Sequence, residues 1–353
     1  MNHILITGGA GFVGSSLAIL FKKEFPKLHI SVLDNLKRRG SELSISRLKQ
    51  NGVNFFHGDI RIKSDFDQIN KFDLLIDCAA EPSVQAGFTS SPMYVLDTNL
   101  NGTINCLETC RQHGSAIIFL STSRVYPIKV LNQISLFETK TRFEIDEKNI
   151  YGVSKEGITE NLTLNGFRSL YGSTKLASEL LITEYNCIYG LKSIINRCGV
   201  LTGPWQMGKV DQGFIVLWIA QHLFNGKLSY NGYGSMGKQV RDILHVNDLF
   251  KLLMIQISDL NLYNGNIYNV GGGLKNSISL LEMTSLCENI TGNKITVEKK
   301  FETNMSDIPL YISDNSKINS ISGWMPSITI SEIIEDVYSW LFKNQELLKS
   351  ILK

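Results

Sequence analysis

Hydrophobic positions in the first half of the chain form short runs that are separated by stretches with helical spacing. His3–Thr7 is an apolar run, and a helix is predicted at Val13–Phe25. Within that helix, Leu17, Leu20 and Phe21 recur on one side. Further runs rich in Ile, Val, Leu and Phe lie at His29–Asp34, Val53–Gly58, Leu74–Ala80, Ala116–Ser121 and Ser193–Arg197, with helical stretches at about 41–50, 92–112 and 173–189. Continuous apolar runs are typical of strands covered on both faces, so this alternation predicts a parallel, doubly wound α/β sheet.

The second half of the chain follows a looser pattern. Residues 202–237 are rich in Gly and aromatic residues, which predicts loops around one helix. Later elements are expected as strands at Val240–Leu244, Ile267–Val270 and Ile295–Glu298, and as helices at Asn247–Ile257, near Leu280–Ile290 and at Ile330–Leu348. These elements predict a smaller lobe that interleaves with the large sheet.

A glycine-rich turn joins the first strand to the first helix. Its glycines stand at 8, 11 and 14 in the segment Gly8-Gly9-Ala10-Gly11-Phe12-Val13-Gly14. This spacing lets the backbone turn tightly and approach a pyrophosphate, whose charge the helix N-terminus stabilises. Asp34 ends the next strand, 20 residues past Gly14, where a carboxylate can accept both ribose hydroxyls and repel a 2′-phosphate. Together they predict a Rossmann-type site for NAD rather than NADP.

Other charged residues near this site have two interpretations. Lys37, Arg38 and Arg39 follow Asp34 and weaken the preference for NAD, although they also suit a solvated loop. Asp59, after the third strand, is placed to reach the adenine, and a turn at a strand end explains it as well. We expect a dinucleotide-binding domain over 1–198, to which 239–262 returns, and a substrate-binding lobe over 199–238 and 263–353.

Tyr171 and Lys175 form the candidate catalytic group because they lie one turn apart on the same face of a predicted helix. A nearby ammonium favours phenolate, so Tyr171 could act as a general base near neutral pH. Tyr151 and Lys155 have the same spacing, but no sustained helical stripe follows them. We interpret that second match as coincidental.

Hydroxyl side chains end the strand that precedes this helix. Thr122 and Ser123 stand at the carboxyl end of a central strand, where ligands bind in open α/β sheets. Thr122 is the candidate for a hydrogen bond to the reacting group, and Ser123 is the second candidate. Capping of the strand end would explain either residue without a catalytic role.

Composition narrows the class of function. The 353 residues suffice for a large core, and a formal net charge of +2 leaves no basic footprint for nucleic acid. Phe214–Ala220 is too short an apolar run to span a membrane, and a strand-like run begins at His3, so a cytoplasmic protein is expected. Cys106 and Cys110 share a helix face, but none of the six cysteines has zinc spacing. We therefore expect reduced, half-buried thiols and no metal site.

From residue 3 to about 340, the chain resembles the extended short-chain dehydrogenase/reductase family of nucleotide-sugar epimerases and dehydratases. The resemblance rests on the glycine turn, Asp34-Asn-Leu, Gly58-Asp-Ile, Asn99-x-x-Gly-Thr, the segment 121–126, Tyr171 with Lys175, Thr202-Gly-Pro and Arg241-Asp. Within the family the chain is most similar to the CDP-paratose 2-epimerases, also called CDP-tyvelose epimerases. This narrower match rests on Ala79-Ala-Glu-Pro-Ser83, Glu138-Thr-Lys-Thr-Arg142, Gly237-Lys-Gln-Val-Arg-Asp242 and the spacing of 49 positions from Thr122 to Tyr171. Glu81, Val84 and Arg124 depart from the pattern of that subgroup.

The resemblance implies which residues bind NAD and the substrate. The implied NAD contacts are Gly8, Gly11, Phe12, Val13, Gly14, Asp34, Asn35, Asp59, Ile60, Ala79, Ala80, Asn99 and Lys175. The implied substrate contacts are Ser83, Gln212, Tyr230 through its backbone, and Arg241. Arg241 would pair its guanidinium with the pyrophosphate, although it could instead pair only with Asp242. Tyr230 could instead be plain strand packing.

The implied reaction is a redox-neutral epimerisation of a nucleotide-activated sugar. Tyr171 takes the proton of a sugar hydroxyl that Thr122 polarises, and the neighbouring carbon gives a hydride to NAD. The hydride then returns to the other face of a transient keto-sugar. Lys175 binds the nicotinamide ribose and holds Tyr171 ionised. Because Ser123 and Arg124 stand where dehydratases carry an acid and a base, dehydration is not expected.

Several alternatives remain at this stage. The main interpretation is a CDP-sugar 2-epimerase. A UDP-sugar 4-epimerase would use the same Thr122, Tyr171 and Lys175, whereas a non-catalytic NAD-binding sensor would commonly lose one of them. A net reductase would consume NADH or NADPH. The resemblance also implies a homodimer or homotetramer that pairs through the helices at 92–112 and around Tyr171.

Overall fold

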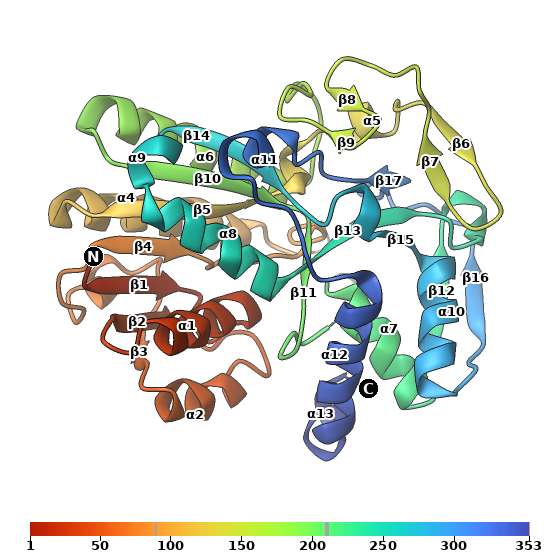
Figure 1. Ribbon diagram of the computed structural model, residues 1–353, viewed down its shortest axis with the longest axis horizontal. Coiled ribbons are helices and arrows are strands. Elements are labelled where there is room, and N and C mark those ends of the chain that lie inside the picture. The colour runs from red at the N-terminus through yellow and green to blue at the C-terminus, as the bar shows by residue number, and fades with distance from the viewer. Residues whose placement is uncertain (89, 209–211, 353) are drawn as a thin grey trace. The chain divides into compact units, whose positions relative to one another are not determined.

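The computed structural model describes residues 1–88, 90–208 and 212–352 and contains one large sheet (Figure 1). Its seven strands lie in the order β14-β10-β5-β4-β1-β2-β3, and the pairings from β3 to β5 are all parallel. The strands are β1 (His3–Thr7), β2 (His29–Asp34), β3 (Asn54–His57), β4 (Leu74–Asp77), β5 (Ala116–Thr122), β10 (Ser193–Cys198) and β14 (Asn266–Val270). The chain changes direction across the sheet between β1 and β4, which is where ligands bind in such folds. The predicted Rossmann-type α/β sheet is confirmed.

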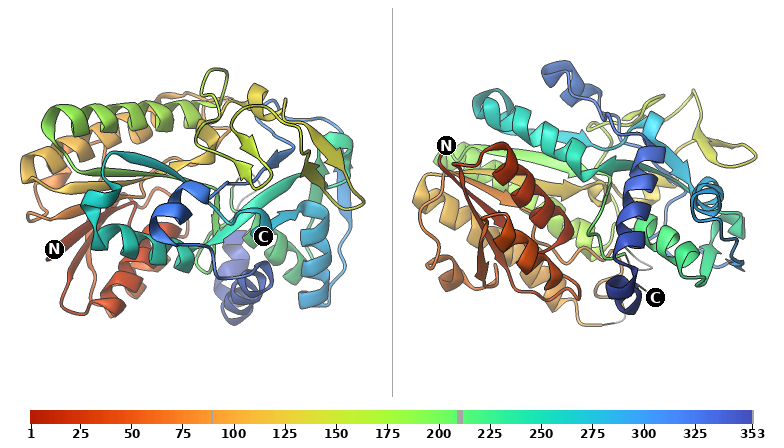
Figure 2. Two further views of the ribbon diagram at one scale, coloured as in Figure 1. Left: turned by 45° about the horizontal axis from the view of Figure 1, so that its top comes forward. Right: turned by 60° about the horizontal axis from the view of Figure 1, so that its bottom comes forward.

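Helices cover both faces of this sheet (Figure 2). One face carries α1 (Phe12–Glu24), α2 (Leu43–Gln50) and α8 (Val246–Ser258), and the other carries α4 (Gly102–His113) and α6 (Leu170–Tyr189). Between the sheet and the second pair, buried apolar side chains such as Leu75, Leu107 and Ile182 form a continuous core. Because water is excluded on both sides, the strands tolerate the unbroken apolar runs seen in the sequence.

The single helix expected at 92–112 is divided into three parts. A short helix, α3 (Met93–Leu96), leads into a π-helical turn (Asp97–Asn101) before α4 begins. In this wider turn the backbone carbonyl of Asn99 is open to side-chain donors. This carbonyl accepts hydrogen bonds from the hydroxyls of Thr103 (2.9 Å) and Ser178 (3.0 Å). Such turns occur frequently at functional sites.

The chain folds into two compact units, each made of three separate segments. The first unit comprises 1–125, 169–197 and 249–268, and the second comprises 126–168, 198–248 and 269–353. The long insert between β5 and α6 therefore packs with the second unit. That NAD binds to one lobe and substrate to the other remains a prediction.

The second unit contains a small sheet in the order β11-β13-β15, with β17 beside β13. Helix α7 packs against α10 and α12. The elements are α5 (Ile128–Leu131), β6 (Leu136–Glu138), β7 (Phe143–Ile145), β8 (Val153–Ser154), β9 (Gly157–Ile158), β11 (Val200–Thr202), α7 (Phe214–Leu223), β12 (Leu228–Asn231), β13 (Val240–His245), β15 (Ser277–Ser279), α10 (Leu280–Thr291), β16 (Val297–Lys300), β17 (Leu310–Tyr311), α11 (Ser316–Ser322), α12 (Ile330–Lys343) and α13 (Gln345–Leu352). A further short helix, α9 (Leu260–Tyr263), belongs to the first unit.

Three sequence-based expectations need correction here. The helix expected at Ile330–Leu348 is two helices, because Asn344 leaves helical geometry and its side-chain amide donates to the Trp340 carbonyl at 2.8 Å. Strand β12 lies within the region expected to be loops around one helix, and it pairs in parallel with β16. The insert contains two small hairpins, β6–β7 and β8–β9, that the hydrophobic pattern did not indicate.

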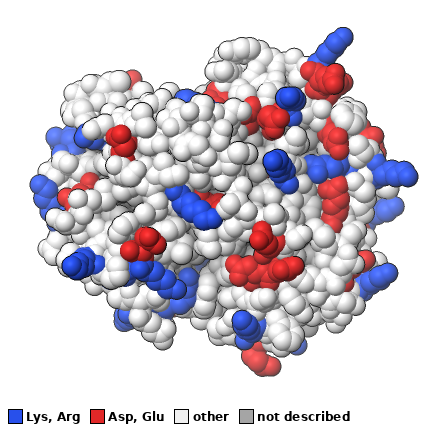
Figure 3. Space-filling view, in the orientation of Figure 1, with Lys and Arg blue, Asp and Glu red and all other residues white. Residues whose placement is uncertain are grey.

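The surface and the helices agree with the ordinary composition. On the face seen in Figure 3, Lys and Arg side chains are interspersed with Asp and Glu. Within the described residues, no helix combines the length and the apolar character that a membrane crossing requires. Cys106 and Cys110 are free thiols, and they are fully buried in the core of the first unit rather than half-buried as expected. Burial raises the pKa of both.

Candidate functional site

The glycine-rich turn lies between β1 and α1 and has little room for side chains. A Cβ atom added to Gly14 would lie 2.3 Å from the Gly8 carbonyl oxygen, and one added to Gly8 would lie 2.8 Å from the Ala79 backbone. At Gly11, by contrast, a Cβ would meet only the Gly8 carbonyl oxygen, at 3.1 Å, among the described atoms. Gly8 and Gly14 therefore close the turn, while Gly11 borders open space at the start of α1. This cradle fits a pyrophosphate.

Asp34 stands at the end of β2, directly beside the turn. Its carboxylate accepts hydrogen bonds from the backbone N–H groups of Ala10 (3.0 Å) and Leu36 (2.7 Å). Burial raises the pKa of Asp34, and these backbone donors oppose that effect. The residue is thus linked directly to the turn that it was predicted to complement. The predicted bond to the cofactor ribose remains a proposal.

Asp59 is already engaged on both carboxylate oxygens. Oδ1 accepts from the backbone N–H and from Nε of Arg61. Oδ2 accepts from a terminal guanidinium nitrogen of Arg61 (2.7 Å) and from the side-chain amide of Asn35 (2.8 Å). Burial acts to raise the pKa of Asp59, but the hydrogen bonds from Arg61 and Asn35 outweigh it and lower the pKa to about 2. An adenine amino group could bind this carboxylate only by replacing one of these donors.

The aromatic ring of Tyr94 lies beside the cationic groups of Arg61 and Lys37.

Asp77, which the sequence analysis did not single out, connects three elements around the cradle. It ends β4, is fully buried, and accepts from the Thr7 hydroxyl at 2.7 Å. The Ala79 N–H (3.2 Å) and the Thr103 hydroxyl (3.3 Å) also donate to it. Ala79 and the following Ala80 are thereby held against the glycine turn. The signal that could have revealed Asp77 is a carboxylate that interrupts an otherwise apolar strand.

Asn99 lies in the π-helical turn and binds the segment that follows β4. Its side chain accepts from the Glu81 N–H (2.8 Å) and donates to the Glu81 carbonyl (3.1 Å) and the Thr174 hydroxyl (3.2 Å). Glu81 in turn accepts from the N–H of Ser83. Asn99 therefore fixes the position of the segment that carries Ala79, Ala80 and Ser83.

Thr122, Tyr171 and Lys175 all belong to the first unit. Thr122 ends β5, and α6, which begins immediately before Tyr171, packs against β5 and the turn that follows it. The Thr122 hydroxyl oxygen accepts from the Arg124 N–H at 3.2 Å, so its proton remains for another acceptor. Lys175 is only 2% exposed, and its ammonium lies 3.9 Å from the centre of the Phe119 ring. The ring face stabilises a buried cation.

The second Tyr/Lys match has a different setting. Tyr151 is 81% exposed and precedes β8, while Lys155 lies in the turn between β8 and β9. Tyr151 and Lys155 therefore do not share a helix face. A shared helix face was the reason for expecting Lys175 to lower the pKa of Tyr171. This placement supports the interpretation that the match is coincidental.

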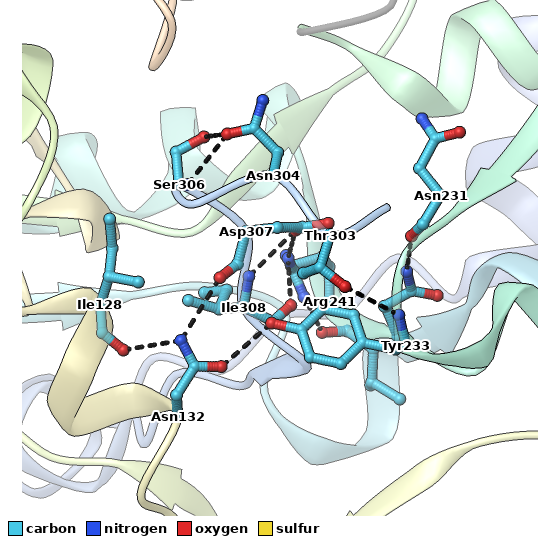
Figure 4. A network of polar contacts seen from close by, with 12 residues as sticks. Ile128, Asn132, Asn231, Tyr233, Arg241, Thr303, Asn304, Ser306, Asp307 and Ile308 are labelled. Atoms are coloured by element: carbon cyan, nitrogen blue, oxygen red, sulfur yellow. Dashed lines mark hydrogen bonds and ion pairs between the residues drawn. The ribbon is translucent and has the colours of Figure 1, made fainter. Parts of the chain in front are cut away.

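In the second unit, Arg241 extends from β13 into a network of polar contacts (Figure 4). Its guanidinium donates to the carbonyl oxygens of Val240 and Ile308, both at 2.8 Å, and pairs with Asp307 at 3.3 Å. Burial lowers the pKa of Arg241. The alternative that Arg241 pairs only with Asp242 is wrong, because the ion-pair partner of Arg241 is Asp307, while Asp242 accepts from the backbone N–H groups at 273 and 313.

Tyr233, not expected from the sequence, borders the same network. Tyr233, Gly234 and Ser235 have φ angles of 46°, 73° and 55°, a left-handed turn that costs energy for the two residues other than glycine. The Tyr233 hydroxyl donates to Asn132 at 3.0 Å, which connects this turn to the insert. Glycines on both sides of Tyr233 are the sequence signal for such a turn.

The other expected substrate contacts lie in separate places. Tyr230 is buried, its hydroxyl bonds Thr284 at 2.7 Å, and its ring stacks on Trp218. This placement is the strand packing that was the alternative for Tyr230, and its backbone pairs with Lys299 of β16. A contact between the Tyr230 backbone and the substrate remains a prediction. Gln212 is half-buried just before α7, and Ser83 belongs to the first unit.

Comparisons with known proteins show the family to which the chain belongs. A family model described as "NAD dependent epimerase/dehydratase family" matches residues 4–271. The chain is 33% identical to a CDP-paratose 2-epimerase of Salmonella typhi, over 96% of this chain and 98% of that protein. It is 28% identical to a UDP-glucuronate 4-epimerase of Thermodesulfobacterium geofontis, over 99% of each chain.

Among solved structures, UDP-glucuronic acid 4-epimerase from Bacillus cereus, in complex with UDP-glucuronic acid and NAD, superposes with a TM-score of 0.80. That likeness covers 97% of this chain and 99% of the other at 24% identity, so it concerns the fold. The family model and the relative of 33% identity extend the agreement to sequence. The chain is therefore an NAD-dependent enzyme that belongs to the NAD dependent epimerase/dehydratase family.

Proposed function

We propose that this enzyme is an epimerase of a nucleotide-activated sugar, namely a CDP-sugar 2-epimerase that acts through a transient keto-sugar. The observation that carries the proposal is the complete set of Thr122, Tyr171 and Lys175 on β5 and α6 of the sheet that also holds the glycine turn. The choice of a CDP-sugar rests on the CDP-paratose 2-epimerase to which the chain is 33% identical.

The three residues have separate roles in the proposed reaction. Tyr171 accepts the proton of the sugar hydroxyl at C2, and Thr122 donates a hydrogen bond to the same oxygen. Lys175, buried beside Phe119, stabilises the Tyr171 phenolate and binds the nicotinamide ribose. When bound, NAD supplies the hydride acceptor and returns the hydride, so no net oxidation occurs. The NAD contacts proposed from the resemblance surround the cradle formed by Gly8, Gly11 and Gly14.

Ser123 and Arg124 support epimerisation over dehydration. Expelling water from a sugar requires an acid and a base beside the reacting carbons, and neither residue suits that role at neutral pH. Arg241, together with Gln212 and Tyr230, is proposed to bind the nucleotide part of the substrate, and Ser83 is proposed as a further substrate contact. A guanidinium is well suited to a pyrophosphate because it offers paired donors.

A UDP-sugar 4-epimerase is the second candidate. It would use the same three residues, and the UDP-glucuronate 4-epimerase of 28% identity favours it. The two candidates differ in the base that the enzyme accepts and in the carbon that it inverts.

One assay separates these candidates from each other and from the alternatives. The enzyme with NAD is incubated with CDP-paratose or with UDP-glucuronic acid, and products are identified by NMR. We expect inversion at C2 of the CDP-sugar without net formation or consumption of NADH. Inversion at C4 of the UDP-sugar would select the second candidate. Net consumption of NADH would indicate a reductase, and bound NAD without turnover of either sugar would indicate a sensor.

The catalytic group is tested by a matched pair of variants. We expect Tyr171→Phe to lower kcat by about 10²–10⁴-fold, because it removes the proton acceptor. Tyr151→Phe is the control, since it deletes the exposed phenol of the second Tyr/Lys match. Equal losses in the two variants would contradict the assignment of Tyr171.

The proposed enzyme is also a homodimer or homotetramer. Helix α6 exposes three large side chains on its second half: Leu180 (63% exposed), Ile188 (64%) and Tyr189 (54%). Leu180 and Ile188 lie about two turns apart on the same side of the helix, and exposed apolar residues placed in this way are typical of an interface between subunits. The proposed occupant is the same helix of a second copy.

A further inference from the structure

A buried ion pair lies directly behind the candidate catalytic group. Glu179 is on α6, one helical turn beyond Lys175, and Arg197 is on β10. Nε of Arg197 donates to both carboxylate oxygens of Glu179 at 3.1 Å, and a terminal guanidinium nitrogen donates to Oε2 at 2.7 Å. The two side chains are only 2% and 3% exposed. A bidentate pair of this kind holds both partners in a defined geometry.

The same carboxylate also binds β5. The Ser121 hydroxyl donates to Glu179 Oε1 at 2.5 Å, within the buried interior. Ser121 is the neighbour of Thr122, and it shares with Phe119 the face of β5 that contacts α6. Glu179 therefore connects three elements: the strand end that carries Thr122, the helix that carries Tyr171 and Lys175, and β10.

Stability alone is a poor explanation for this arrangement. Removing two charges from water is costly, and well-packed apolar residues of similar volume often stabilise a core equally well or better. Charged hydrogen bonds differ from apolar contacts in that they fix distances and angles. Such bonds would hold the position of Thr122 constant relative to that of Tyr171.

We propose that Glu179 is a positioning residue, which through Ser121 and Arg197 holds the end of β5 in register with α6. This inference rests on the proposed function. Thr122 and Tyr171 must address the same substrate oxygen, and catalytic groups require placement to within about 0.5 Å. A misplacement of about 1 Å can lower the rate of the chemical step about 100-fold.

Helix α6 has a separate attachment through the residues next to Lys175 and Glu179 in the sequence, which face a different direction around the helix. Its Thr174 and Ser178 bond to Asn99 in the π-helical turn. Loss of the Ser121 bond therefore frees the end of β5 without freeing the helix. Ser121→Ala is the sharpest test, because it removes this bond and leaves the Glu179–Arg197 pair intact.

The matched control is Tyr185→Phe. Tyr185 donates to Glu108 at 2.6 Å, a hydroxyl-to-carboxylate bond on the same helix but far from Tyr171. We expect Ser121→Ala to lower kcat about 10- to 100-fold, with KM for the nucleotide sugar and the content of bound NAD changed less than about twofold. Tyr185→Phe should keep the wild-type kcat. Thermal unfolding of both variants verifies that they are folded.

A pH profile distinguishes positioning from an effect on ionisation. Tyr171 and Lys175 share one helix, so Ser121→Ala should lower kcat at every pH and leave the midpoint of the acid limb unchanged. A shifted midpoint would overturn the inference, because Ser121 would then act on the ionisation of Tyr171.

A double variant tests the ion pair itself. Glu179→Met with Arg197→Met replaces both charges by apolar volume. A folded double variant with reduced kcat supports the inference, and one with wild-type kcat overturns it. If the double variant does not fold, Ser121→Ala decides: wild-type kcat in that variant overturns the inference. Absence of turnover in the wild-type enzyme would instead overturn the proposed function.

Discussion

At the scale of single residues, the carboxylates around the cofactor cradle are bound by the chain itself. Asp34 accepts from the glycine turn, Asp77 from the ends of β1 and β4, and Asp59 from Arg61 and Asn35. Each carboxylate is therefore oriented before a ligand arrives. Pre-orientation lowers the entropy that binding must overcome.

The sequence reveals only some of these residues. Glycine spacing and the Tyr171/Lys175 pair are local patterns, so they can be read directly. Asp77 and Glu179 depend on partners far along the chain, such as Thr103 and Arg197. No periodicity indicates which buried carboxylate will meet which donor, and both residues were missed for that reason.

The glycine turn yields a residue-scale prediction. Gly11→Ala should lower the free energy of unfolding by no more than about 1 kcal/mol, because the Cβ would have one tight contact, 3.1 Å from the Gly8 carbonyl oxygen, which a small shift relieves. The same Cβ enters the space proposed for the pyrophosphate, so NAD affinity should fall about tenfold, equivalent to losing one good hydrogen bond. Calorimetric titration with NAD measures the affinity.

Gly14→Ala provides the contrast. Its Cβ would lie 2.3 Å from the Gly8 carbonyl oxygen, so the turn itself must move. We expect a loss of about 2–3 kcal/mol of stability, measured by denaturant unfolding without NAD. Equal stability of the two variants would contradict the division of roles between these glycines.

At the scale of helices and strands, long elements were predictable and short ones were not. The strands of the large sheet and the helix α6 follow from unbroken apolar runs and helical spacing. The strands of the insert have only two or three residues each, too few for a period to appear. The break at Asn344 depends on a local side-chain bond within an otherwise continuous apolar stripe.

The hairpin β6–β7 gives a prediction at this scale. Arg142 attaches it to β15 and α10 of the same unit, through the backbone carbonyl and hydroxyl of Ser277 and an ion pair with Glu282. Arg142→Met should therefore make residues 136–145 more susceptible to limited proteolysis, while the thermal midpoint changes by only about 2–4 °C. Mass spectrometry of the fragments locates the cut.

Arg111→Met is a suitable control for that experiment. Arg111 pairs with Glu108 on the surface of α4 and attaches no loop. Cleavage within 136–145 at the wild-type rate in Arg142→Met would show that Arg142 does not hold the hairpin.

At the scale of the whole molecule, the proposed pairing of subunits through α6 makes the assembly state testable. Leu180→Glu combined with Ile188→Glu places two charges on the exposed apolar residues of the helix. We expect this variant to sediment as a monomer, because burying unpaired charges at an interface is costly. Analytical ultracentrifugation measures the mass of each form.

The control for assembly is Leu262→Glu, on the short helix α9, where the leucine is 53% exposed. This variant should retain the wild-type mass. If the wild-type protein is itself a monomer, or if the double variant assembles normally, pairing through α6 is wrong.

The three-segment composition of each unit has a consequence for synthesis. The first unit is complete only when 249–268 has emerged from the ribosome, because β14 at the edge of the large sheet comes from that segment. Until then the edge of β10 is unpaired, and an exposed strand edge invites association with other chains. Between the synthesis of β10 and that of β14 the nascent chain therefore carries an unpaired strand edge, and no single splice point would transfer one unit intact to another gene.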